Sequence, residues 1–257
     1  MNNVNKTLYI PLYGKAHVSQ RGIILKDTKA EEIWKAEGFT LKGKAASKWL
    51  AYSMGMRSAV FDQWLREKMI QLPDAVVVHL GCGMDSRVCR VGTQDHLWLD
   101  IDFPEVIRER KRYYRETPAY QMLSFDIREE QWLASVPEER AVIVVMEGVS
   151  MYLTPAELGS LMERIGHCFR RCCLLMDCYT VFAAKASRYK NPINEVGVTQ
   201  VYGLDDPTGL GLTFLREHSL TPDCLIEQLT GMEKRIFRSV FAGSFAKKLY
   251  RLYEFSS

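Results

Sequence analysis

Residues 76–91, VVVHLGCGMDSRVCRV, restrict the possible folds of this chain more than any other segment. A hydrophobic run leads into a turn that holds Gly81 and Gly83, and the residues after the turn suit a helix. Glycines at such a turn let the backbone bend tightly and come close to a ligand. The order of strand, glycine turn and helix indicates a nucleotide-binding α/β fold, although Ser86 stands where a dinucleotide fingerprint has its third glycine.

Short apolar runs alternate with helical patterns through the middle of the chain. Five of these runs are expected as strands, at residues 75–80, 96–102, 120–126, 141–147 and 172–177. Strands that alternate with helices predict a parallel sheet with helices on both faces. We therefore expect an α/β protein.

Three segments carry signals of helices. Residues 44–70 place apolar side chains on one broad stripe at 100° per residue, and Arg57 falls inside that stripe. Pro104 suits the first turn of a helix after the second expected strand. Thr154 and Glu157 form a capping box, which predicts that a helix begins there.

The pattern changes toward the C-terminus. Residues 179–207 are expected as an inserted helix and loop that cap the edge of the sheet. Residues 208–257 contain two runs that alternate as strands do, LTFLREHSL and KKLYRLYEF, and we expect the second to close the sheet at one edge as an antiparallel strand. No repeat or linker divides the chain, so we predict one domain over 1–257, with an N-terminal helical cover at 1–72 and a core at 73–178.

Acidic residues end, or directly follow, four of the expected strands. They are Asp100 or Asp102, Asp126, Glu147 and Asp177. The carboxyl ends of parallel strands share one edge of the sheet, and ligands of open α/β sheets bind outside that edge. Any one of these acids has a solvated strand end or a helix cap as its alternative. Together they predict a ligand site.

The ligand that best matches this edge has a ribose and an adenine but no phosphate. The absent third glycine weakens a pyrophosphate site, and the chain contains no Tyr-x-x-x-Lys pair of a short-chain dehydrogenase. S-adenosyl-L-methionine (AdoMet) is such a ligand. Acids after the second and third strands can accept the ribose hydroxyls and the adenine amino group, and Glu147 and Arg57 can meet the ammonium and carboxylate of its methionine part. A structural salt bridge is the alternative for Arg57.

The charge balance argues against nucleic acid as a partner. The chain has 34 basic and 31 acidic residues, a formal net charge of +3, which is too even for the basic surface that nucleic-acid binding requires.

The N-terminus has no apolar signal-peptide core, and no apolar run approaches about 20 residues, so we expect a cytoplasmic protein with no membrane partner. The seven cysteines are expected as reduced thiols, and without a CxxC pair we expect no metal site.

Three motifs lie at the predicted ligand site: LGCGMDSR at 80–87, LDIDFPEVI at 99–107 and EGVSMYLT at 147–154. Together with residues 10–33 and 202–207 they resemble the leucine carboxyl methyltransferase family, and within it the bacterial branch of tetracenomycin-type small-molecule O-methyltransferases. The resemblance covers nearly the whole chain. It implies a Rossmann-like class I methyltransferase with AdoMet as cofactor, a seven-stranded, mostly parallel sheet whose last strand is antiparallel, and N-terminal helices that help to cover the active site.

The resemblance also implies which residues hold the methionine part of the cofactor. Gly81, in the same turn as Gly83, approaches this part of the ligand. Glu147 holds its amino group, and Arg57 holds its carboxylate. Lys15 matches a basic residue that also grips the cofactor near the carboxylate.

The nucleoside part of the cofactor is implied to contact three further positions. Asp102 or Asp100 holds the ribose. Both side chains point to one face of the strand because its period is two, so only the point at which the strand ends decides between them. Asp126 with Ile127 meets the adenine.

The expected reaction is an in-line transfer of a methyl group to oxygen, in which the protein mainly aligns the reactants and excludes water. A carboxylate acceptor is ionised at neutral pH and needs no base, whereas a hydroxyl needs one. His17 and Tyr152 are the candidate bases, with a helix-surface position and a packing role as their alternatives. We predict an AdoMet-dependent O-methyltransferase that acts on a carboxylate or hydroxyl of a small-molecule acceptor. Methylation of a protein C-terminus and AdoMet binding without catalysis are the alternatives.

Overall fold

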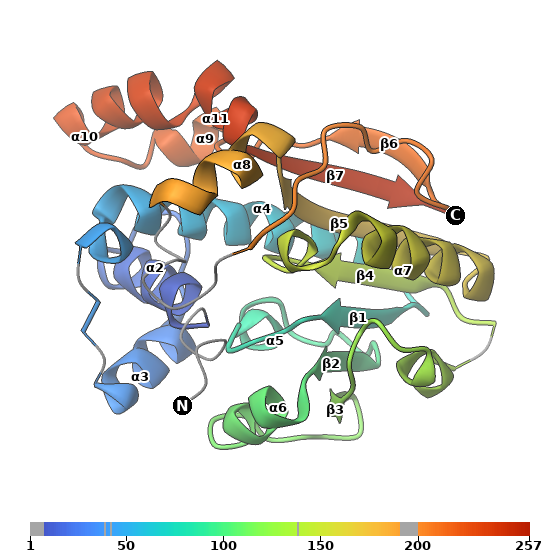
Figure 1. The fold of residues 1–257 in the computed structure, drawn as a ribbon. Coiled ribbons are helices and arrows are strands. Elements are labelled where there is room, and N and C mark those ends of the chain that lie inside the picture. The colour runs from blue at the N-terminus through green and yellow to red at the C-terminus, as the bar shows by residue number, and fades with distance from the viewer. Residues whose placement is uncertain (1–7, 39, 42, 138, 191–199) are drawn as a thin grey trace.

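The structure, a computed structural model, describes residues 8–257 except 39, 42, 138 and 191–199. A seven-stranded sheet in the order β3-β2-β1-β4-β5-β7-β6 crosses the molecule (Figure 1). Strands β1 to β5 are parallel to one another, and β7 lies antiparallel between β5 and β6. The predicted α/β fold with a mostly parallel sheet and a last antiparallel strand is confirmed. The expectation that the last strand closes the sheet at one edge is wrong, because β6 pairs with the outer side of β7 and forms the edge.

The strands match the apolar runs of the sequence closely. The five expected strands are all present, to within two residues at each end, and both C-terminal runs contain a strand. The strands are β1 (Val76–Leu80), β2 (Trp98–Asp102), β3 (Tyr120–Ser124), β4 (Val142–Met146), β5 (Cys172–Tyr179), β6 (Thr213–Glu217) and β7 (Tyr250–Ser256).

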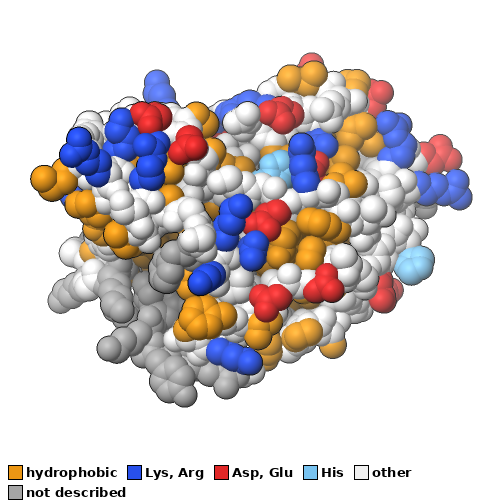
Figure 2. Space-filling view, turned by 90° about the horizontal axis from the view of Figure 1, so that it is seen from above, with side chains coloured by type: hydrophobic (Ala, Val, Ile, Leu, Met, Phe, Trp, Pro, Cys, Tyr) orange, Lys and Arg blue, Asp and Glu red, His pale blue; other side chains and the backbone are white. Residues whose placement is uncertain are grey.

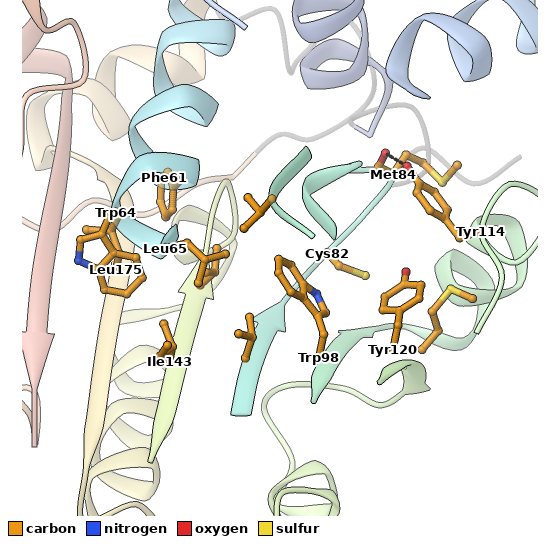
Figure 3. Packing of buried hydrophobic residues seen from close by; sticks show 14 of the residues in the cluster. Phe61, Trp64, Leu65, Cys82, Met84, Trp98, Tyr114, Tyr120, Ile143 and Leu175 are labelled. Carbon is orange, nitrogen blue, oxygen red and sulfur yellow. Dashed lines mark hydrogen bonds between the residues drawn. The ribbon is translucent and has the colours of Figure 1, made fainter. Parts of the chain in front are cut away.

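Helix α4 (Lys48–Gln71) covers one face of the sheet. Figure 3 shows Phe61, Trp64 and Leu65 of α4 over Ile143 of β4 and Leu175 of β5. The helix is buried on most of its surface because further helices pack on its other side. Although α4 has 24 residues, neither it nor any other helix among the described residues combines the length and the apolar composition of a membrane span.

Helix α7 (Pro155–Cys168) covers the opposite face, where the alternate side chains of the strands form a second core. Its start is the predicted capping box. The backbone N–H of Glu157 donates to the Thr154 hydroxyl at 3.2 Å, and the Glu157 carboxylate accepts from the Thr154 N–H at 2.8 Å. Two shorter helices, α5 (Arg87–Val91) and α6 (Pro104–Arg110), follow β1 and β2, and Pro104 occupies the first turn of α6 as expected.

The N-terminal helix α2 (Tyr9–Gln20) lies beside α4, and α3 (Thr28–Glu37) packs on α2 (Figure 1). Close packing of α2 on α4 depends on Gly14, where a Cβ would lie 2.7 Å from Cβ of Met54. Gly55 of α4 plays the same part opposite Val18, where a Cβ would lie 2.8 Å from a methyl carbon. This packing brings one side of α2 to the carboxyl end of the sheet.

A helical segment between β6 and β7 was not expected from the sequence. It consists of α9 (Asp223–Ile226), α10 (Gly231–Ile236), the π-helical turn η5 (Phe237–Phe241) and α11 (Gly243–Leu249). Glu233 of α10 joins it to the N-terminal helices by accepting from Lys48 at 2.7 Å and from Arg21 at 3.0 Å. Figure 2 shows lysine and arginine side chains gathered over this end of the molecule, with acidic side chains among them.

The predicted cap insertion is described only in part. Its helix, α8 (Val181–Lys190), directly follows β5 and packs on α11 and β5. Residues 191–199 of the insertion lie outside the described residues.

Candidate active site

A cavity of about 470 Å³ opens at the carboxyl ends of β1 and β4. The strand order reverses at this point, because β2 and β3 follow on one side and β5 on the other. Ligands of doubly wound sheets bind at this switch point, and the volume suits a small molecule. The loops after β1 to β4 line the cavity together with side chains of α2, α4 and the short helix η3 (Ser150–Tyr152).

The glycine turn after β1 is tightly packed. Gly81 has a φ of 64° and donates its N–H to the carbonyl oxygen of Ile101 at 2.8 Å. A Cβ at Gly81 would lie 2.3 Å from Cγ2 of Val149, which leaves no room for a side chain. Gly83 has a φ of 51° and also lines the cavity. Glycine therefore meets both a conformational and a steric requirement at position 81.

Asp102, at the end of β2, faces the cavity. Its Oδ2 accepts from the N–H of Gly83 at 2.7 Å, and its Oδ1 accepts from the N–H of Phe103 at 2.8 Å. Burial raises the pKa of the Asp102 carboxyl to about 6, although these two N–H groups oppose the shift. A carboxylate has about four lone-pair sites, so Asp102 can accept further hydrogen bonds from a ligand.

Asp100 lies behind the cavity and is not among its described lining residues. It is fully buried, pairs with Arg110 at 2.5 Å and accepts from the Tyr120 hydroxyl at 2.7 Å. Its pairing with Arg110 ties β2 to α6. Of the two aspartates left open by the sequence, Asp100 is therefore withdrawn as a ligand-binding residue, because the strand ends two residues after it.

Asp126 and Ile127 follow β3 and both line the cavity. The Asp126 carboxylate accepts from the side chain and the backbone N–H of Arg128, each at 3.0 Å, and the Arg128 side chain lowers its pKa. Ile127 is buried and presents an apolar surface. The loop after β3 thus offers a polar group and an apolar one side by side.

A buried ion network lies at the other end of the cavity. Its members are joined to one another by ion pairs of 3.4 Å or less and come from the N-terminal helices, α4, the glycine turn, α5, β5 and the loop after β4. The network consists of the cations Lys15, Arg57, Arg87 and Arg90 and the carboxylates of Asp27, Asp62, Asp85, Glu147 and Asp177.

Arg57 and Glu147, both predicted as site residues, meet in this network. Nε of Arg57 lies 3.0 Å from Oε1 of Glu147, which also accepts from the Ser58 hydroxyl at 2.9 Å. Oε2 of Glu147 accepts from Arg87. Burial would raise the pKa of Glu147, but Arg57 and Arg87 outweigh it and hold the pKa at about 2. Both Arg57 and Glu147 line the cavity, and the salt bridge that was the alternative for Arg57 is present.

Lys15 reaches the network from α2. Its Nζ lies 3.2 Å from Oδ2 of Asp85, and both side chains line the cavity. Asp85 was not among the predicted site residues, although its place in the glycine motif could have indicated it. Burial opposes the charge of Asp85, but Arg90, Lys15 and Arg87 hold its pKa well below the usual range. The pair fastens α2 to the glycine turn.

The charges of the network fit AdoMet. The network has one more carboxylate than it has cationic groups, and it is almost entirely buried. Buried charge is stable only where a partner compensates it. AdoMet carries an ammonium and a sulfonium against a single carboxylate, so its surplus positive charge matches the surplus negative charge of the network.

Apolar side chains form another part of the cavity lining, called here the apolar wall. It includes Leu8, Pro11, Leu50, Met54 and Met151, which come from the start of α2, from α4 and from η3. Tyr152, predicted as a candidate base, also lines the cavity and is 39% exposed. These side chains can contact an apolar molecule in the cavity.

His17 does not lie at the cavity, and we withdraw it as a candidate base. It is two residues beyond Lys15 on α2, which turns its side chain by about 200° away from the side that lines the cavity. Its ring lies near Tyr13 and Tyr52, with centroids 5.6 and 6.1 Å away. Burial lowers the pKa of His17, which favours the neutral ring.

The fold and this cavity define a class I, AdoMet-dependent methyltransferase. The chain belongs to the leucine carboxyl methyltransferase family, whose profile matches residues 7–166. The resemblance seen in its motifs is thereby confirmed.

Two curated relatives and one solved structure show the extent of the likeness. The tetracenomycin polyketide synthesis O-methyltransferase TcmP of Streptomyces glaucescens is 29% identical over 262 residues, which cover 98% of this chain and 97% of the relative. The S-adenosyl-L-methionine-dependent methyltransferase dpfgK of Gibberella zeae is 30% identical over 66% of this chain and 63% of its own length. A putative methyltransferase from Thermobifida fusca YX has the same fold, with a TM-score of 0.59 and 11% identity over 95% of this chain and 94% of that one.

Proposed function

We propose that this methyltransferase transfers the methyl group of AdoMet to a carboxylate of a small, largely apolar molecule. The observation that carries the proposal is that one cavity is lined both by members of the buried ion network, which form its charged end, and by the side chains of the apolar wall. The name of the relative TcmP, a polyketide O-methyltransferase, agrees with a small-molecule acceptor. Methylation of a hydroxyl on the same kind of molecule is the nearest alternative.

The nucleoside of the cofactor would lie along the loops after β2 and β3. Asp102 has the free lone pairs to accept from the ribose hydroxyls. Asp126 offers an acceptor for the adenine amino group, and Ile127 offers an apolar surface for the ring. Of the two aspartates of β2, only Asp102 is therefore proposed to bind the ribose.

The methionine part would lie in the ion network. Glu147 and Arg57 already face each other, so an ammonium and a carboxylate on one carbon can pair with both of them at once. Lys15 adds a second cation for the carboxylate from the side of α2. Gly81 and Gly83 give the ligand a close approach to the backbone.

When bound, AdoMet supplies a methyl group that its sulfonium has already activated. In the proposed arrangement the charged groups lie on one side of that methyl, and Met54, Leu50 and Met151, which also line the cavity, lie on the other. Apolar side chains there exclude water and align the acceptor for in-line attack. The work of the protein is thus positioning.

A carboxylate acceptor needs no base, and the acids that line the charged end are poor ones. Cations hold the pKa of Glu147 at about 2 and that of Asp85 well below its usual range. His79, the only histidine among the described lining residues, is buried beside Asp100 and Arg87, and burial lowers its pKa. An acceptor that arrives ionised is the one that this set of side chains serves best.

Transfer of labelled methyl from AdoMet to a panel of aromatic and aliphatic acids, each with its matched phenol or alcohol, tests the proposal. A leucine-ended peptide is the control for a protein C-terminus. We expect labelled product from the acids, and the label should be released as methanol in mild alkali because it is held in an ester. If the label is stable to alkali, the product is an ether. The acceptor group would then be a hydroxyl and not the proposed carboxylate.

A further inference from the structure

Arg57 donates hydrogen bonds to two residues that were not predicted to bind the cofactor. Its Nη1 donates to Oδ2 of Asp177 at 2.9 Å and to the hydroxyl of Tyr250 at 2.7 Å. That hydroxyl in turn donates to Oδ2 of Asp177 at 2.6 Å. The three groups form a closed triangle of hydrogen bonds beneath the cavity.

The register of the last strand brings Tyr250 to this position. In the antiparallel pairing of β5 and β7, Tyr179 lies opposite Tyr250 and Asp177 lies opposite Leu252. Asp177 and Tyr250 are therefore diagonal neighbours on one face of the sheet, within reach of a long side chain. Tyr250 also packs edge-on against Tyr179, with ring centroids 5.0 Å apart, and both rings line the cavity.

Asp177 ties four parts of the chain together. Its Oδ1 accepts from the N–H of Gly148 at 2.6 Å, directly after the cavity-lining Glu147, and its backbone oxygen accepts from the Ser150 hydroxyl. Asp177 is fully buried and does not line the cavity, so it can act on a ligand only through its neighbours. Burial raises the pKa of the Tyr250 hydroxyl far above its usual value, which keeps the group protonated and able to donate.

These contacts engage two of the three nitrogen atoms of the Arg57 guanidinium and leave Nη2 toward the cavity. Nε and Nη1 are engaged by Glu147, Asp177 and Tyr250. Nη2 lies beside Gly148, 3.5 Å from the position that a Cβ there would take, and Gly148 lines the cavity. A guanidinium is planar and rigid, so fixing Nε and Nη1 also fixes the direction in which Nη2 donates.

We propose that Tyr250 is a positioning residue for cofactor binding, which together with Asp177 aims Nη2 of Arg57 at the carboxylate of the methionine part. The inference rests on the proposed contact between Arg57 and that carboxylate. Tyr250 stands at the junction between the unexpected helical segment and β7, so this segment takes part in the site by placing the first residue of the last strand.

Calorimetry of Tyr250→Phe with two ligands tests the proposal. S-adenosylhomocysteine (AdoHcy) carries the methionine-derived carboxylate, whereas 5′-methylthioadenosine shares the adenosine and the thioether but lacks the amino-acid group. We expect the Kd of AdoHcy to rise about tenfold, because a hydrogen bond to a charged group is lost, while the Kd of methylthioadenosine stays within about twofold. A general loss of structure would weaken both ligands equally, and that result or an unchanged AdoHcy Kd would overturn the inference.

Tyr253→Phe is the matched control, since it removes a hydroxyl from the same strand. Tyr253 is buried, and its hydroxyl donates to the carbonyl of Asp205 at 3.3 Å, so both Kd values should stay at the wild-type level. Arg57→Lys separates the two proposals because it keeps the charge and removes the guanidinium edge. If Arg57→Lys leaves the preference for AdoHcy intact, the contact assigned to Arg57 fails. If Arg57→Lys abolishes the preference and Tyr250→Phe does not, only the role of Tyr250 fails.

Discussion

Arg57 and Met54 lie about one turn apart on α4, yet they belong to two different parts of the same cavity. Arg57 is fixed in the buried ion network, where its hydrogen-bond partners come from β5, β7 and the loop after β4. Met54 belongs to the apolar wall and packs against α2 at Gly14. Hydrogen bonds and ion pairs therefore fix the side chain of Arg57, whereas only van der Waals packing holds that of Met54.

This difference predicts how the two parts respond to change. A buried ion pair that loses one partner leaves an uncompensated charge, so the charged end has little tolerance for substitution. An apolar wall tolerates changes of side-chain volume much better. The acceptor can therefore vary within such a fold while the cofactor site stays the same.

Gly81→Ala should give the largest effect, at the charged end. The new Cβ would have to displace Val149, and alanine would be strained at a φ of 64°, so we expect the Kd of AdoHcy to rise about 100-fold. Gly92→Ala is the control, since Gly92 also has a positive φ, of 78°, but no heavy atom lies within 4 Å of its added Cβ. Calorimetry on both variants checks the expectation, and equal affinities in the two would contradict it.

The pH dependence of AdoHcy binding should give the next largest effect. Burial raises the pKa of Asp102 from 3.8 to about 6, and only the ionised carboxylate accepts from both ribose hydroxyls. Affinity should therefore fall by about tenfold as the pH drops from about 7 to about 5. Asp102→Asn should show a flat profile over this range. A profile in Asp102→Asn that keeps the slope of the wild type would place the titrating group elsewhere.

The same shift has a defined sign for stability. Because the folded pKa of Asp102 exceeds its unfolded value, folding favours the protonated form. The contribution of this group to stability is therefore present at low pH and falls as the pH rises from about 4 to about 6. Glu147 and Asp85 act with the opposite sign, because their folded pKa values lie below the ordinary ones. Their contribution to stability is present above the ordinary pKa values and is lost as the pH falls toward the folded ones.

Met54→Ala should give the smallest effect and confine it to the acceptor. We expect the KM of the best acid from the panel to rise about fivefold, because part of the apolar wall is lost, while the Kd of AdoHcy stays within about twofold. Met232→Ala on α10 is the matched control, since Met232 is 76% exposed and does not line the cavity. If Met54→Ala raised the Kd of AdoHcy as much as the KM of the acid, the charged end and the apolar wall would not be functionally distinct.

Local patterns were sufficient to predict the frame of the molecule. The apolar runs, the proline of α6 and the capping box of α7 each gave an element at the expected place. The helical segment between β6 and β7 was missed because its helices have only four to seven residues. Such helices are too short to show a period of 3.6 in the sequence.

Individual side chains at the site were harder to predict. Asp100 and Asp102 share a strand face, so only the point at which β2 ends could separate them. His17 and Lys15 lie on one helix, and the packing of α2 on α4 decided which of the two faces the cavity. Asp85 lies within a motif that was recognised, but its ion pair with Lys15 depends on where α2 comes to lie.

The sequence by itself determined the α/β frame, the carboxylates at the edge of the sheet and the family, because periodicity and motifs are properties of neighbouring residues. Only the tertiary structure decided how the charges are paired. Arg57 lies 120 residues from Asp177 and 193 residues from Tyr250, and these three meet only where α4, β5 and β7 come together. No local sequence pattern predicts these contacts, because the energy of a buried charge depends on partners that only the folded chain brings within hydrogen-bonding distance.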